Sequence, residues 1–165
     1  MTTLFLIPQA IYEVRLAWMS QTYVQNPGSI PRRAFRLVVA SALLGVGLSL
    51  GMMVMAHPLV LFIYGSEYAS SGNLLVILSA ILLLKSISFA LASVITAVGW
   101  QSKRVIVQAI TALLNIGLNI FFIRRFGLTG VAYIYIVSES VLMLGYMFYL
   151  LNWQYRAPYL VEGKI

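Results

Sequence analysis

The 165-residue sequence contains no cysteine, no aspartate and a single histidine. Without cysteine the chain cannot form a disulfide, a thiolate zinc site or an iron–sulfur cluster, and cysteine usage says nothing about the redox compartment. With one His and no Asp, neither a Ser/His/Asp triad nor a clustered metal site can be built from these residues. We therefore expect a protein that is not an enzyme and carries no cofactor.

Charge is scarce and mostly positive. Only 9% of the residues are charged and 61% are hydrophobic, against about 25% and 45–50% in soluble domains. Eleven Lys and Arg face four acidic residues, for a formal net charge of +7. These basic residues lie between long apolar runs and do not gather on a face that could meet phosphates, so we expect no nucleic-acid partner. The composition excludes an ordinary soluble enzyme.

Four apolar stretches are long enough to cross a bilayer, which takes about 17–25 residues in a helix. The second contains one charged residue, Lys85, and the fourth contains Glu139. The predicted fold class is all-α, a polytopic transmembrane helix bundle. The four predicted spans cover residues 37–56, 74–98, 105–123 and 131–151.

The opening segment, residues 4–19, is apolar but short, and Pro8, Glu13 and Arg15 interrupt it. It does not resemble a secretory signal, because no basic residue precedes the apolar core. An amphipathic helix lying at the membrane interface is one interpretation. We favour a fifth, polar-lined membrane helix, so that residues 1–165 form one transmembrane domain with residues 152–165 as a cytoplasmic tail.

The positive charges alternate between successive loops, which predicts an orientation because basic short loops stay in the cytoplasm. Residues 20–36, 99–104 and 152–165 carry seven Lys and Arg, whereas the opposite loops carry only Arg124 and Arg125. We therefore expect the first three segments in the cytoplasm and residues 57–73 and 124–130 outside. The predicted location is a bacterial inner or plasma membrane, crossed several times.

Charged and amide side chains inside the spans are the candidate substrate-binding residues. A charge at the centre of a bilayer costs about 2.5–3.5 kcal/mol, so such a group normally faces protein or water. Lys85 either lines an aqueous cavity that attracts an anion or forms an ion pair with Glu139 or Glu13. Arg15 is either a phosphate contact or an interfacial anchor.

Three further features of the spans allow two interpretations each. Asn115 and Asn119 continue a polar stripe along one helical face, which either lines a hydrated path for sugar hydroxyls or joins helices by hydrogen bonds. Glu139 shares its face with several tyrosines, a surface that contacts either a ligand or another helix. Gly47 and Gly51 form a GxxxG pattern, which favours close helix packing over a phosphate loop.

Three sequence segments carry a resemblance to a known family. They are the span end from His57 to Leu78 (HPLVLFIYGSEYASSGNLLVIL), the loop from Ala97 to Arg104 (AVGWQSKR) and the turn from Arg124 to Glu139 (RRFGLTGVAYIYIVSE). In order and spacing they resemble the carboxy-terminal lobe of polysaccharide-biosynthesis oligosaccharide flippases, the Wzx-type branch of the MATE-like flippase superfamily. The resemblance covers residues 4–151.

The resemblance implies a transport function without bond cleavage. Such proteins have two helical lobes with about 12–14 spans, and they move a polyprenyl-pyrophosphate oligosaccharide across the membrane through a cavity between the lobes. This chain supplies about five helices, so we expect a missing amino-terminal lobe or a second chain as a partner, along with membrane lipids. Alternatives are a cation-coupled exporter of small molecules from the same superfamily, a membrane subunit that does not transport, and a truncated remnant.

Overall fold

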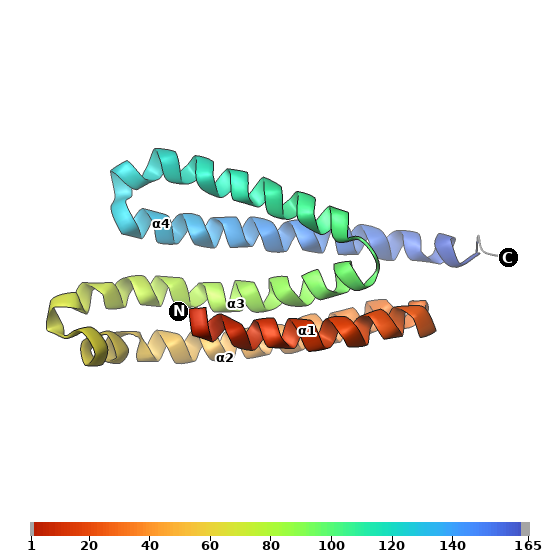
Figure 1. Ribbon diagram of the computed structural model, residues 1–165, viewed down its shortest axis with the longest axis horizontal. Coiled ribbons are helices and arrows are strands. Elements are labelled where there is room, and N and C mark those ends of the chain that lie inside the picture. The colour runs from red at the N-terminus through yellow and green to blue at the C-terminus, as the bar shows by residue number, and fades with distance from the viewer. Residues whose placement is uncertain (1, 163–165) are drawn as a thin grey trace.

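The computed structural model describes the backbone of residues 2–162 and the side chains of residues 10, 12–26 and 28–152. The described residues form helices and connecting turns, with no strand among them. Four long helices follow one another along the chain, and two short 3-10 turns connect the first three (Figure 1). The long helices are α1 (Thr2–Gln25), α2 (Ile30–Tyr64), α3 (Ala69–Ala97) and α4 (Gln101–Glu162).

Helix α4 reverses direction at Gly127, so its two arms run antiparallel (Figure 1). Gly127 has φ 56° and ψ −146°, a backbone conformation that glycine adopts without a side-chain clash. The arms lie against each other, because a side chain added at Gly145 on the second arm would meet Val107 on the first. The two apolar stretches expected at 105–123 and 131–151 are these arms.

Among the described residues, three helices are long and apolar enough to cross a membrane by length and composition, namely α2, α3 with its preceding turn, and α4 to Asn152. The predicted helical bundle is confirmed at this level. The helices extend beyond the apolar stretches: α2 begins at Ile30 and α4 continues to Glu162, through most of the segment expected as a tail. Apolarity marks only the part that suits a bilayer, whereas backbone hydrogen bonds carry a helix into polar residues. Residues 163–165 lie outside the described residues.

Helix α3 lies at the centre of the bundle and packs against α1, α2 and α4 (Figure 1). Its second half contains an almost continuous run of buried residues from Ala90 to Ile95. The core joins this run to Met19 of α1, Leu37 of α2 and Tyr146 of α4. Helix α3 is therefore the element on which the rest of the chain is assembled.

One close approach of α2 to α3 occurs at Gly45. A Cβ atom at Gly45 would lie 2.9 Å from Cβ of Ser86 and 3.0 Å from Cα of Leu83. Gly47 and Gly51 are exposed and meet nothing within 4 Å, so the predicted GxxxG contact is not made between the described helices of this chain. The sequence pattern selected the wrong glycines for the contact within the bundle, because the α2 helix turns Gly45 toward α3.

The start of α2, the α3–α4 connection and the end of α4 lie at one end of the bundle, and the α2–α3 connection and the Gly127 turn lie at the other (Figure 1). The first end holds the segments that carry Arg32, Arg36 and Lys103, and the second end holds the segment that carries Arg124 and Arg125. The fold therefore separates the two groups of charges in space, as the alternation along the sequence requires.

Substitution of Gly45 tests the α2–α3 contact. We expect Gly45→Ala to destabilise the protein by about 1–3 kcal/mol, because the new methyl group has no space against Ser86 and Leu83. Thermal unfolding in detergent measures the effect. Gly47→Ala is the matched control and should be neutral or stabilising, since it meets nothing and alanine favours a helix. Equal melting temperatures for the two variants would contradict this packing.

Candidate functional site

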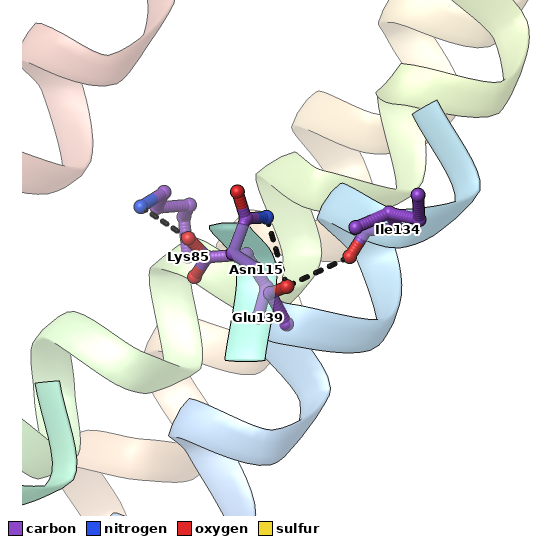
Figure 2. Close-up of polar contacts among 5 residues, drawn as sticks. Lys85, Asn115, Ile134 and Glu139 are labelled. Atoms are coloured by element: carbon purple, nitrogen blue, oxygen red, sulfur yellow. Dashed lines mark hydrogen bonds and ion pairs between the residues drawn. The ribbon is translucent and has the colours of Figure 1, made fainter. Parts of the chain in front are cut away.

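An ion pair lies inside the bundle between α3 and the second arm of α4. Nζ of Lys85 is 2.5 Å from Oε1 of Glu139, and the side chains are 22% and 7% exposed (Figure 2). The ammonium group also lies 5.6 Å from the centre of the Tyr135 ring, which is one helical turn before Glu139. The structure thus brings two of the candidate residues into direct contact.

The pair explains how both charges are accommodated in apolar helices. An isolated charge at such a site is expensive, and attraction to an opposite charge at hydrogen-bonding distance offsets much of the desolvation. Of the alternatives that the sequence left open for Lys85, this geometry matches the ion pair with Glu139. The lysine charge is balanced within the chain, and Glu139 retains a second carboxylate oxygen, Oε2, which is buried without a protein hydrogen-bond partner.

The two asparagines of the polar stripe contact each other and the opposite arm of α4. Nδ2 of Asn119 donates to the backbone oxygen of Asn115 at 2.9 Å and to its Oδ1 at 3.1 Å. Nδ2 of Asn115 donates to Oγ of Ser138 at 2.9 Å, and that hydroxyl donates to the backbone oxygen of Ile134 (Figure 2). The bond from Asn115 to Ser138 joins the two arms of α4, which is the joining role that amides play between membrane helices.

The same asparagines line a cleft between α3 and the α4 hairpin. Its volume is about 400 Å³, within the range of about 300–1,000 Å³ typical of ligand sites. Tyr135 contributes a third polar group, and the other walls are apolar side chains such as Leu78 and Val131. Because Tyr135 also contacts Lys85, the cleft and the ion pair are neighbours.

Arg15 is on a different side of α3 from this cleft and does not join the other candidates. It is exposed and borders a small recess of about 10 Å³ between α1, α2 and α3. Three serines, Ser41, Ser86 and Ser93, also line this recess. Arg15 forms no ion pair with any side chain that the structure describes. Its charge therefore remains available at the surface of the helix bundle.

Arg104 has a structural role that the sequence interpretation missed. Its Nη1 donates to the Tyr12 hydroxyl at 2.6 Å and to Oγ1 of Thr96 at 3.1 Å, and the guanidinium lies 5.3 Å from the Tyr12 ring. It joins α1, α3 and α4 at the basic end of the bundle. The sequence identified Arg104 only as a loop charge. No local pattern could reveal a partner 92 residues away.

His57 and Pro58 lie within α2 and not at its end. The ring of His57 covers Gly72 at the start of α3, where a Cβ atom would come within 2.8 Å of the imidazole. This contact gives His57 a packing role between α2 and α3. No group of three or more His, Cys, Asp or Glu residues that could hold a metal occurs in the described part of the chain.

Comparison with known proteins identifies no relative of this chain. No protein-family model, no curated protein and no solved structure matches the chain.

Removal of one partner of the ion pair should be far more harmful than removal of both. We expect Lys85→Met to cost about 3–5 kcal/mol, because it leaves Glu139 charged and buried without its partner. The double variant Lys85→Met, Glu139→Leu should recover most of that loss, since no unpaired charge remains. Unfolding of the purified protein in detergent measures each variant. If the double variant is as unstable as the sum of the two single variants, the residues do not interact.

Proposed function

We propose that this chain is a helical lobe of a flippase that moves a polyprenyl-pyrophosphate oligosaccharide across a membrane for surface polysaccharide synthesis. The observation that supports this best is the cleft of about 400 Å³ lined by Asn115, Asn119 and Tyr135 within helices apolar enough for a bilayer. Three polar side chains in an otherwise apolar recess suit a cargo that joins sugars to a hydrocarbon chain, because a ligand site of this kind combines apolar walls with a few polar groups. Asn115, Asn119 and Glu139 are the residues that we assign to the sugar side.

The remaining step is to neutralise the pyrophosphate. Lys85 has a carboxylate partner, so we assign the cationic role chiefly to Arg15, which has none among the described side chains. An arginine suits this role because its guanidinium offers paired donors to phosphate oxygens. The recess beside Arg15 is too small for a phosphate. The contact would therefore form on the exposed side of the guanidinium, which we propose faces a second lobe.

The proposed arrangement in the membrane has four spans, formed by α2, α3 and the two arms of α4, with α1 as a fifth membrane helix. Helix α1 packs along α3, and its Tyr12 bonds to Arg104. The basic end of the bundle would face the cytoplasm. A second lobe, from another segment or another chain, would complete the cavity, because alternating access requires two bodies that move against each other.

A cation-coupled exporter is the second candidate, and Glu139 is the observation that favours it. The residue is an acid buried within the bundle, and its Oε2 has no protein partner. Its other oxygen, however, is held by Lys85. A lysine already occupies the place that a coupling cation would take, so we rank this function below export of a lipid-linked glycan.

The orientation can be tested by labelling, since the chain has no native cysteine that would react. We expect Ser102→Cys, in the α3–α4 connection, to react with a membrane-impermeant thiol reagent only from the cytoplasmic side. Ser66→Cys, in the α2–α3 connection, should react only from outside. The measurement compares intact cells with inverted vesicles. Labelling of both positions from the same side would contradict a membrane crossing by α3.

The cargo can be tested by binding to the purified chain in lipid nanodiscs. We expect a polyprenyl-pyrophosphate oligosaccharide to bind more tightly than the free polyprenol. Arg15→Ala should weaken binding about tenfold, the effect of losing one charge-assisted contact of about 1.4 kcal/mol. Asn119→Ala should weaken binding of the glycan-bearing lipid without affecting binding of bare polyprenyl pyrophosphate.

Matched controls distinguish these effects from a general change in charge or polarity. Arg36→Ala removes an exposed arginine of α2, and Asn73→Ala removes an exposed asparagine at the start of α3. Both should bind the lipid as the unaltered chain does. Wild-type affinity in Arg15→Ala would contradict the cationic role, and equal affinity for the pyrophosphate and the polyprenol would contradict the cargo.

A further inference from the structure

Most of the buried polar atoms that lack a hydrogen-bond partner among the described residues belong to the two arms of α4. Three of them are Oε2 of Glu139, Oγ1 of Thr111 and the hydroxyl of Tyr146, and none has a hydrogen-bond partner in the described part of the chain. The three residues are only 5%, 8% and 1% exposed. Each such group would ordinarily make a hydrogen bond, because an unsatisfied buried polar atom is strongly destabilising.

Thr111 lies on the first arm midway between Val107 and Asn115, which come close to Gly145 and Ser138 of the second arm. Glu139 and Tyr146 are seven residues apart on the second arm, which is about two helical turns on one face. Arg104 and Thr111 have the same spacing on the first arm. The side chains of Arg104 and Gln108 on the first arm lie close to the Tyr146 hydroxyl but do not form a hydrogen bond of standard geometry with it, and Glu139 lies within electrostatic range, so Tyr146 connects the two rows. Arg104 adds a fourth unpartnered atom, Nε, at the basic end.

The chemistry of this row points to one ligand. A carboxylate oxygen and two hydroxyls offer several acceptors and few donors, and Nε of Arg104 offers one donor. Water both donates and accepts, and a buried water typically makes about three hydrogen bonds to groups of this kind. A metal ion would need more carboxylates, and the described chain supplies one here.

We propose that internal water molecules bind between the arms of α4 and bridge Glu139, Thr111 and Tyr146 toward Arg104. The bound water hydrates the Glu139 oxygen that Lys85 does not contact, and this completes the compensation of a carboxylate buried among apolar helices. The polar row then extends from the basic end of the bundle to the ion pair beside the cleft. This inference depends on the fold and not on the cargo assigned to the protein.

Removal of the Tyr146 and Thr111 hydroxyl groups tests the proposal, because bridging water and unpartnered hydroxyls predict opposite changes in the melting temperature. Tyr146→Phe and Thr111→Val keep the side-chain shape. If water bridges these hydroxyls, each variant should lower the melting temperature in detergent by about 2–4 °C. The double variant should lower it by less than the sum, because both hydroxyls hold the same water network. If the hydroxyls are simply unpartnered, their removal raises the melting temperature or leaves it unchanged, and that result overturns the proposal.

Matched variants on the same helix complete the experiment. Tyr133→Phe and Thr129→Val remove the same groups from exposed positions of α4 and should leave the melting temperature unchanged. Thr111→Ser keeps the hydroxyl and should retain more stability than Thr111→Val. A fully additive double variant, or a Thr111→Ser variant less stable than Thr111→Val, contradicts shared water. Because these readouts involve no lipid cargo, their failure is separate from failure of the proposed transport.

Discussion

The attraction between Lys85 and Glu139 is the interaction on which the assignment of the site depends. Each charge is unfavourable among apolar helices, and each is accommodated because the other lies at hydrogen-bonding distance. The pair also fixes how the α4 hairpin lies on α3. Because it neutralises Lys85, the site is a largely apolar cleft with two asparagines and a tyrosine in its wall, beside a balanced ion pair.

The other buried polar groups of the bundle also need partners, because a polar group among apolar helices is unfavourable unless it is hydrogen-bonded. Asn119 satisfies Asn115, and Asn115 satisfies Ser138 on the opposite arm. Arg104 joins α1 and α3 through two hydroxyl groups. Glu139, Thr111 and Tyr146 each have a buried polar atom without a protein partner. The inferred water supplies hydrogen bonds to these three atoms. The asparagines that join the helices therefore also form part of the wall of the cleft.

Much of the architecture could be predicted from residue patterns alone. The apolar runs predicted helices, and Gly127 lies between two of them, where the chain reverses. The Asn115 and Asn119 spacing predicted a shared face, and the two side chains do contact each other. Other features could not be predicted in this way. Gly45 contacts α3 and Gly47 does not. Which of the two glycines faces α3 depends on the rotation of α2 about its axis, and the sequence of α2 alone does not show that rotation.

The sequence by itself determined that the chain is helical and apolar enough for a membrane, because these properties follow from local composition and from hydrogen bonds between residues four apart. Only the tertiary structure decided which charge is balanced. Lys85 and Glu139 are 54 residues apart, and Arg15 has an acid two residues away that would lie on another side of its helix. Partner choice depends on which faces the packing of α3 brings together, and no local pattern encodes that rotation.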